Sequence, residues 1–205
     1  MCFALLLIFN QSKAQDQINI QLANEYLNKG DKQKALEIFQ DLARHNENIN
    51  YIHVNYFNTL LELQQYKEAE EYLRKQLKRE PGNLLFQLDL GILWLRTGEV
   101  MKSDRHIKQL IAENAGIPGR IKYASDYLTS KSLLDYAILC LVESRKVFKT
   151  ESIYALELAN LYRYKSDRQK MAEEYLNYAT QNLGNIQYIK SLLQVMLTKP
   201  EELEE

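Results

Sequence analysis

The chain has 205 residues, of which 46% are hydrophobic and 26% charged, a composition typical of a folded domain or a short repeat array and not of a disordered chain. Its formal net charge of −1 at pH 7 provides no basic field that would attract nucleic acid or acidic lipid. Two Cys and three His, scattered along the chain, show no metal-ligand spacing, so we expect no metal or other cofactor.

The first stretch of the chain has the pattern of an export signal. Residues 2–9 are all apolar, and Asn10 and Gln11 are followed by the small-residue pattern Ser12-Lys13-Ala14. About eight apolar residues are too few to cross a bilayer, which needs roughly 20. They match the apolar region of a signal peptide that is cleaved after Ala14, and we predict residues 1–14 as such a peptide. The alternative is an apolar N-terminal helix docked on the structure that follows.

A short turn that recurs every 34 residues organises the rest of the chain. It is clearest in Lys29-Gly30-Asp31, and Lys165-Ser166-Asp167 nearly copies it four periods later. Apolar spacings of three and four on both sides of each turn predict two amphipathic helices of about a dozen residues. The sequence therefore predicts five helix-turn-helix units, at residues 16–49, 50–83, 84–117, 118–151 and 152–185.

Apolar residues keep the same place in every unit. Three columns are apolar in all fifteen positions, although the chain as a whole is 46% hydrophobic. These columns are Leu22, Tyr56, Leu90, Ala124 and Leu158; Tyr26, Leu60, Trp94, Leu128 and Tyr162; and Phe39, Leu73, Ile107, Leu141 and Tyr175. Such regularity predicts a repeated core that neighbouring units share.

Small residues and turn residues support the same period. Small side chains dominate two columns, which predicts close helix contacts there: Ala23, Phe57, Gly91, Ser125 and Ala159; and Ala35, Ala69, Ser103, Ala137 and Met171. Gly30 and Gly98 can adopt the left-handed conformation that ends a helix. Asp31 and Asp167 can cap the helix that follows.

The C-terminal stretch does not complete a further unit. Residues 186–198 read as a capping helix or as the first helix of a sixth repeat, and 199–205 as an acidic tail. The helix has more apolar surface than a solvating cap should show, which favours a chain that is the N-terminal piece of a longer protein. A natural capping helix followed by an acidic tail is the alternative.

The repeats resemble the tetratricopeptide family over nearly all of residues 16–185. The resemblance rests on Leu90-Gly91 with Trp94 and Gly98, on Ala35 with Phe39, on Ala69 with Leu73, and on Pro81. It implies an all-α fold, a right-handed superhelical α-solenoid whose first helices line a concave face that binds other proteins. Pentatricopeptide repeats, which read RNA, have a similar period, but the slightly acidic chain argues against them.

The leader adds a second resemblance. Its end, Ser12-Lys13-Ala14-Gln15, is similar to the leaders of exported proteins in the Bacteroidota. This implies a periplasmic or outer-membrane-associated location. A cytoplasmic adaptor is the alternative.

Helical spacing predicts which side chains face the concave groove. Aliphatic residues there suit an amphipathic helix, and Asn side chains suit the backbone of an extended peptide, because each offers a donor and an acceptor. The predicted groove residues are Ile20, Asn24, Leu27, Val54, Asn58, Leu61, Leu88, Ile92, Leu95, Asp126 and Asn160.

Other reactive residue types are predicted to be structural. His45, His53 and His106 lie in three different repeat units, on unrelated helix faces, and are interpreted as surface or hydrogen-bonded side chains. Cys140, among aliphatic residues, is interpreted as a buried small hydrophobe. The carboxylate pairs Glu70-Glu71 and Glu173-Glu174 are expected on solvated helix faces, whereas catalytic pairs need a shielded pocket.

These observations predict a function without catalysis. We expect a protein-protein interaction scaffold that holds a peptide or helix of a partner in a cell-envelope assembly, has no small-molecule substrate, and meets a membrane only through a partner. The alternative is a docking or regulatory arm of a larger enzyme or envelope protein that continues beyond residue 205.

Overall fold

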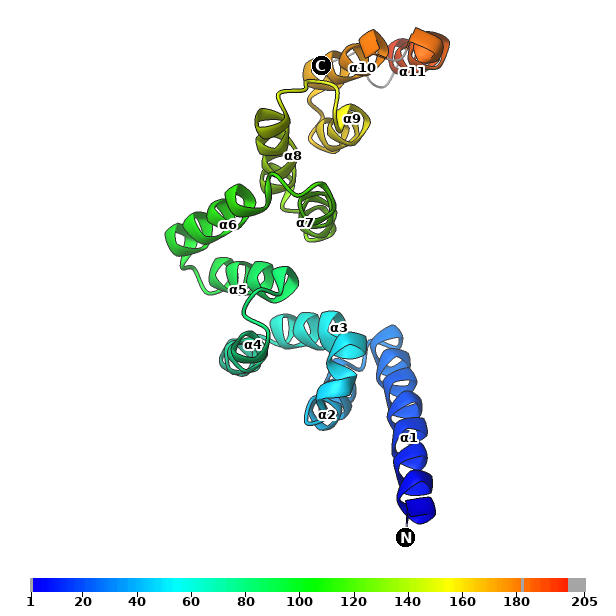
Figure 1. Cartoon of the computed structure of the whole chain (residues 1–205), viewed down its shortest axis with the longest axis vertical. Coiled ribbons are helices and arrows are strands. Elements are labelled where there is room, and N and C mark those ends of the chain that lie inside the picture. Colours follow the sequence, from blue (N-terminus) through cyan, green and yellow to red (C-terminus); the bar gives the residue numbers. More distant parts are fainter. Residues whose placement is uncertain (1, 182, 199–205) are drawn as a thin grey trace. The chain divides into compact units, whose positions relative to one another are not determined.

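The computed structural model describes residues 2–181 and 183–198, with the side chains of residues 14–180 and 184–194. The predicted tail, 199–205, lies outside the described residues. All regular structure in the described part is helical, so the all-α prediction is confirmed (Figure 1). The helices are α1 Cys2–Asn28, α2 Lys32–Leu42, α3 Ile49–Glu62, α4 Tyr66–Arg79, α5 Leu84–Arg96, α6 Val100–Asn114, α7 Pro118–Ser130, α8 Leu134–Phe148, α9 Ala155–Tyr164, α10 Arg168–Gln181 and α11 Ile186–Thr198, with short 3-10 turns η1 Asn46–Asn48 and η2 Leu183–Asn185.

The 34-residue period is carried by the turn inside each helix pair. The helix before the turn ends at Asn28, Glu62, Arg96, Ser130 and Tyr164, and the helix after it begins at Lys32, Tyr66, Val100, Leu134 and Arg168. Every such turn therefore has the same length and the same phase. The connections between pairs vary instead, from residues 115–117 to the longer 43–48, which includes η1.

A left-handed residue lies in the middle of each of these turns. The φ angle is +80° at Gly30, +58° at Gln64, +84° at Gly98, +59° at Ser132 and +57° at Ser166. The next backbone N–H donates to the carbonyl five residues earlier, at 2.8–2.9 Å in all five turns, as in Asp31 to Tyr26. This pattern closes the first helix of each pair. The expectation for Gly30 and Gly98 is confirmed, whereas the three non-glycine positions were not anticipated.

Acidic caps begin two of the second helices. The Asp31 carboxylate accepts a hydrogen bond from the Lys34 backbone N–H at 3.3 Å, and Asp167 accepts one from Lys170 at 3.1 Å. Each bond satisfies a donor that the first helical turn would otherwise leave unpaired. The capping prediction is confirmed at both positions.

The predicted columns form the core. The column from Phe39 to Tyr175 and both small-residue columns are buried in every repeat. A Cβ atom on Gly91 would lie 2.7 Å from Ile107 Cγ1, so only glycine fits there without a shift. Ser103 Oγ donates to the Gly91 carbonyl at 2.7 Å, and Ser125 Oγ one repeat later donates to the Ala137 carbonyl at 3.0 Å. The second bond runs in the opposite direction between the same two columns.

One column departs from the prediction at its first member. Leu22 is 39% exposed, although Tyr56, Ala124 and Leu158 in the same column are buried. In the first compact unit Tyr56 packs against Phe39 of the preceding second helix, with ring centroids 6.0 Å apart. Among the described residues no second helix precedes α1 to cover Leu22 in the same way.

The contacts divide the chain into two compact units. The first holds the chain up to Gly82 together with Ile92–Val100, and the second holds Asn83–Gly91 and the residues from Met101 onward. In the first unit, the His53 ring stacks with Phe57 and with Tyr72, and its Nδ1 lies 2.9 Å from the Tyr72 hydroxyl. In the second, helices α7 and α8 lie side by side as a hairpin, as do α9 and α10 (Figure 1).

A buried ion pair joins α8 to α10 in the second unit. The Arg145 guanidinium donates to both Glu174 carboxylate oxygens at 2.7 and 2.5 Å, and its Nε donates to the Ile153 carbonyl at 2.7 Å. The expectation that Glu174 lies on a solvated face was therefore wrong. It lies three residues after Met171 and next to Tyr175 on the buried face of α10, where Arg145 balances its charge. Glu173 is exposed, as expected.

The turn geometry predicts opposite effects for two glycine exchanges. Gln64→Gly should raise the free energy of unfolding by up to about 1 kcal/mol, because glycine relieves the steric cost of the left-handed conformation. Gly30→Ala should lower it by about 1 kcal/mol. Urea unfolding followed by circular dichroism measures both. Gln40→Gly, inside α2, is the control and should destabilise; a stabilising Gly30→Ala would contradict the argument.

The buried pair predicts strong coupling between two side chains. Arg145→Met should lower the free energy of unfolding by about 3–5 kcal/mol, because Glu174 would remain buried without a countercharge. Adding Glu174→Leu should recover part of this loss. The exposed neighbour Lys146, which pairs with Glu143 at 2.6 Å, is the control, and Lys146→Met should cost less than about 1 kcal/mol. Equal costs for Arg145→Met and Lys146→Met would disprove the expected difference.

Candidate functional site

Two first helices in the first compact unit present an accessible strip of side chains. Each α1 residue in it has its counterpart 34 residues later on α3. Val54 is 42% exposed and Tyr51 74%, and most of the others are half-buried. We call this set the first-helix strip: Gln17, Ile20, Asn24 and Leu27 on α1, and Tyr51, Val54, Asn58 and Leu61 on α3.

A hydrogen bond orients one of the predicted groove amides. Asn55 on α3 donates through Nδ2 to Asn24 Oδ1 on α1 at 2.7 Å, which joins the two helices. The Asn24 oxygen is thus occupied, and its Nδ2 makes no hydrogen bond to any residue that the structure describes. This nitrogen is suited to donate to a carbonyl group of a bound peptide.

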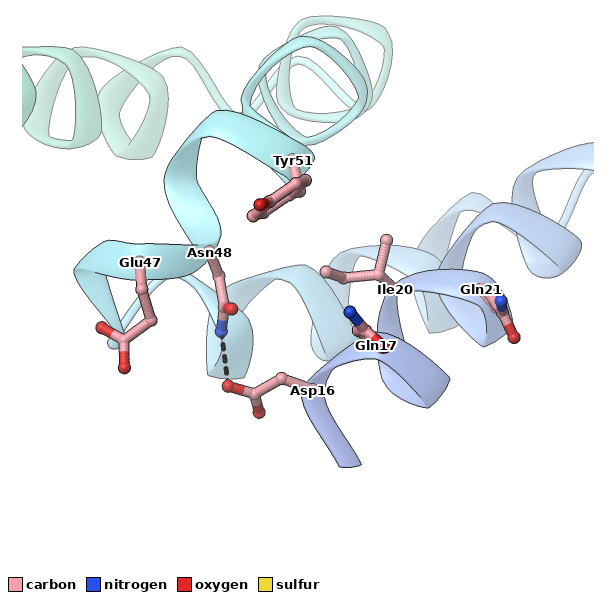
Figure 2. Close-up of a pocket in the computed structure, with 7 residues that line it drawn as sticks. All are labelled: Asp16, Gln17, Ile20, Gln21, Glu47, Asn48 and Tyr51. Carbon is pink, nitrogen blue, oxygen red and sulfur yellow. Dashed lines mark hydrogen bonds between the residues drawn. The ribbon is translucent and has the colours of Figure 1, made fainter. Parts of the chain in front are cut away.

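A cavity of about 570 Å³ lies at the end of the strip nearer to the start of both helices. Figure 2 shows the stretch of α1 from Asp16 to Gln21 on one side and η1 with the start of α3 on the other. Asn48 is 5% exposed and donates through Nδ2 to Asp16 Oδ2 at 2.8 Å and to the Leu42 carbonyl at 3.3 Å. The lining residues are Asp16, Gln17, Ile20, Gln21, Glu47, Asn48 and Tyr51.

Two groove predictions in the third repeat do not fit the structure. Leu88 is fully buried and Ile92 is 4% exposed, so neither can contact a partner on the surface. The physical reason is that α5 is apolar around most of its circumference, which favours burial on more than one face. Leu95, near the end of the helix, is half-buried.

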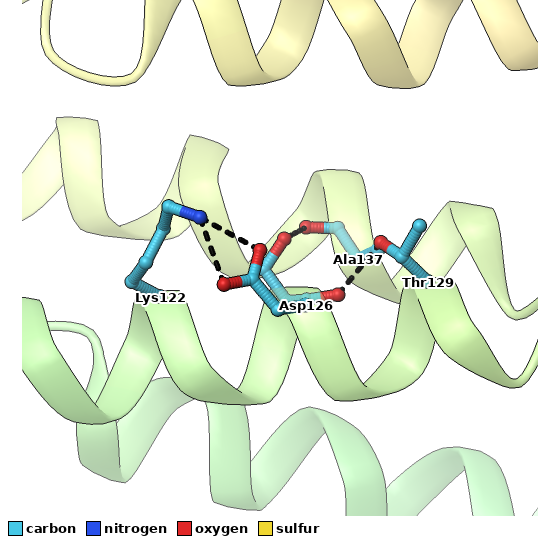
Figure 3. Close-up of polar contacts among 5 residues, drawn as sticks. Lys122, Asp126, Thr129 and Ala137 are labelled. Atoms are coloured by element: carbon cyan, nitrogen blue, oxygen red, sulfur yellow. Dashed lines mark hydrogen bonds and ion pairs between the residues drawn. The ribbon is translucent and has the colours of Figure 1, made fainter.

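The fourth and fifth repeats place polar residues at the groove positions. Lys122 Nζ donates to both Asp126 carboxylate oxygens at 2.7 and 2.8 Å, and Asp126 is exposed (Figure 3). Thr129 donates to the Ser125 carbonyl, and Asn160 on α9 is exposed. A smaller cavity of about 350 Å³ is lined by Thr129, Ser132, Leu134 and Tyr164. Lys122 and Asp126 are paired with each other, whereas the first-helix strip has accessible apolar side chains and an unused donor at Asn24. We therefore treat the first-helix strip as the candidate site.

The remaining reactive side chains are engaged or buried. His45 Nδ1 lies 3.4 Å from Asp16 Oδ2, and His106 Nε2 lies 2.9 Å from the Gln87 carbonyl oxygen, in line with the interpretation of the histidines as surface or hydrogen-bonded. Cys140 is fully buried, which confirms its interpretation as a small buried hydrophobe, and this burial raises the pKa of its thiol to about 12.

The described residues contain no group of three or more His, Cys, Asp or Glu side chains arranged to hold a metal ion. No helix among them combines the length and the apolar character that crossing a bilayer requires.

Sequence reasoning missed most of the cavity lining. Extending the groove columns by one helical turn would have found Gln17 and Tyr51, because they are one period apart. Glu47 and Asn48 come from the connection between helix pairs, which has no fixed length and so gives no periodic signal. Asp16 lies within hydrogen-bond distance of Asn48 only because that connection brings the chain back to α1.

Comparison with known proteins found no matching family model and no matching curated protein. Two solved structures of MamA are similar at 16% identity and a TM-score of 0.43. One is a double mutant of MamA from RS-1, and the match covers 84% of this chain and 97% of that chain. The other is MamA from residue 41 onward of Desulfovibrio magneticus RS-1, and the match covers 83% of this chain and 97% of that chain. YrrB, described as a TPR protein with an unusual peptide-binding site, has 16% identity and a TM-score of 0.38 and covers 79% of this chain and 84% of its own. The fold assignment rests on the periodic helices and turns themselves.

Proposed function

We propose that this chain is a non-catalytic scaffold of the tetratricopeptide type that holds a segment of another protein along its first helices. The first-helix strip is the observation that carries the proposal. Its aliphatic side chains offer apolar surface to a partner helix, and the Nδ2 of Asn24 offers a hydrogen bond to a partner backbone. The carboxylate pair that was expected to be solvated is instead partly engaged in a structural ion pair, with Glu174 bonded to Arg145. We therefore assign no catalytic role to it.

The strip also limits what kind of partner fits. Val54 and Tyr51 are accessible, whereas Ile20, Leu27 and Leu61 are half-buried and form a shallow apolar surface between two helices. Such a surface suits a peptide segment that gains affinity from several modest contacts rather than a small molecule enclosed on all sides. We propose that the partner is a protein or peptide.

We further propose that the protein works in the cell envelope. The support is the sequence of residues 1–14, which has the apolar run and the small-residue end of a signal peptide. Residues 2–14 form the beginning of α1. A periplasmic or outer-membrane-associated scaffold would meet a membrane only through the partner that it holds.

Charged substitutions in the strip test the scaffold proposal. Val54→Asp together with Leu61→Asp should abolish capture of a partner from envelope extracts, because two carboxylates would have to be desolvated against an apolar segment. Circular dichroism and thermal unfolding check that the helices remain. Val54→Asp alone, at a 42% exposed position, should already reduce capture with little effect on folding.

A matched control places the same charges on second helices. Met101 and Val147 are 77% and 54% exposed on α6 and α8, and Met101→Asp with Val147→Asp should leave capture unchanged. Capture that survives in the folded Val54 and Leu61 variant, or that is lost equally in the control, would rule out the first-helix strip as the binding surface.

The export proposal has its own test. Intact-mass measurement of the protein from the envelope fraction should give a mature chain that begins at Gln15. Leu6→Arg, which interrupts the apolar run of the leader, should leave the chain unprocessed in the cytoplasm. A wild-type protein that retains residues 1–14 and stays in the cytoplasm would refute export.

A further inference from the structure

The cavity at the end of the first-helix strip has more hydrogen-bond acceptors than donors. Asn48 is more than nine-tenths buried, and both of its hydrogen bonds use Nδ2. Its Oδ1 accepts no hydrogen bond from any residue in the described part of the chain and faces the space between the two segments in Figure 2. This acceptor lines the cavity and is suited to accept a hydrogen bond from a ligand.

The same space contains an acidic group with unused acceptor capacity. The side chain of Asp16 is 16% exposed, and both of its contacts within the described residues, Asn48 Nδ2 at 2.8 Å and His45 Nδ1 at 3.4 Å, involve Oδ2. Its Oδ1 is therefore left for an incoming group. Glu47 adds a second carboxylate to the lining, and the lining residues that the structure describes include no Lys or Arg. A ligand that brings several donors and a positive charge fits this arrangement best.

Apolar and aromatic groups flank these acceptors. Ile20 lines the cavity from α1, and the Tyr51 ring, 74% exposed, lines it from α3 (Figure 2). An exposed tyrosine ring can stack on a planar cation, and an aliphatic residue can pack against the methylene stem that carries it. Asp16 and Asn48 are hydrogen-bonded neighbours, so one planar group with several donors can reach an oxygen of each.

We propose that this cavity binds the side chain of an arginine in the segment held along the first helices. The guanidinium presents five N–H donors in one plane, which matches neighbouring acceptors and stacking on a ring better than an ammonium does. The inference rests on the proposed function for the origin of the arginine, since the strip leads directly into the cavity through Ile20. The chemistry of the cavity itself can be tested without any partner.

The probe is N-acetyl-L-arginine amide, added to the ¹⁵N-labelled full chain with residues 1–14 present, in which α1 continues before Asp16, and followed by NMR. The backbone amide shifts should be saturable and concentrated at Gln17, Asn48 and Tyr51. N-acetyl-L-citrulline amide has nearly the same shape without the charge and should bind about tenfold more weakly. N-acetyl-L-lysine amide should also bind more weakly than the arginine probe, because its ammonium cannot span two acceptors in a plane.

Two variants locate the binding charge. Asp16→Asn keeps the size of the side chain and its ability to accept from Asn48, and should raise the Kd for the arginine probe about fivefold or more. Glu47→Gln, a side chain without a hydrogen bond within the described residues, should raise it by a smaller factor. The matched control is Asp41→Asn on α2, an exposed acid outside the cavity, which should leave the Kd unchanged.

Three results would overturn the proposal. Equal binding of the arginine and citrulline probes would exclude a charge-selective cavity, and equal binding of the lysine probe would exclude selection of a guanidinium. Equal effects of Asp16→Asn and Asp41→Asn would exclude a local role for Asp16. Arginine binding in a protein whose partner capture is insensitive to Val54→Asp and Leu61→Asp would support the cavity while refuting the groove, so the two failures are distinguishable.

Discussion

The backbone hydrogen bond across each hairpin turn is the constraint on which the rest of this structure depends. It joins the residue after a left-handed position to the carbonyl five residues earlier, and it has nearly the same length in all five turns. Because the turn always has the same length, the second helix of every pair begins in the same rotational phase. Residues 34 apart therefore hold equivalent positions within their own helix pairs, and the core columns follow from this equivalence. Two of the five positions use glycine, whereas Gln64, Ser132 and Ser166 adopt the left-handed conformation despite the steric cost of a side chain.

Close packing between paired helices follows from the same phase. A single helix of about a dozen residues is marginal in water, so each pair gains its stability by sharing a buried face with its neighbours. The Gly91 and Ser103 positions bring two backbones together, and in the next repeat Ser125 and Ala137 occupy the same two columns. The serine that donates the hydrogen bond is thus on the second helix of the third repeat and on the first helix of the fourth, and the contact between the two helices is the same. In these two repeats both helices carry a small residue at the contact, and the hydrogen bond starts from whichever helix carries the serine. In the second and fifth repeats Phe57 and Met171 occupy one of the two positions.

The repeats differ from one another at the predicted groove positions. The first two repeats leave aliphatic and asparagine side chains half-buried or exposed there, the third buries Leu88 and Ile92, and the fourth holds the ion pair of Lys122 with Asp126. The cavity beside Asp16 forms where the connection between helix pairs is long enough to include a 3-10 turn. The 34-residue period therefore places one side chain per repeat at each predicted groove position. The residue types at those positions, and the length of the connections between helix pairs, differ from repeat to repeat and determine the local chemistry.

The sequence alone determined the fold class, the position of every hairpin turn and the membership of the main core columns, because these depend on local apolar spacing repeated at a fixed interval. It also placed the caps at Asp31 and Asp167 and the burial of Cys140, both of which depend on immediate neighbours in the chain. Tertiary structure alone decided that Glu174 is buried against Arg145, since the pairing joins residues of different repeats whose spacing is not periodic. Tertiary structure also decided that Leu88 and Ile92 are buried and that Asp16, Asn48 and Tyr51 line one cavity. Burial depends on which surfaces meet in space, and the irregular connections between helix pairs determine which surfaces meet.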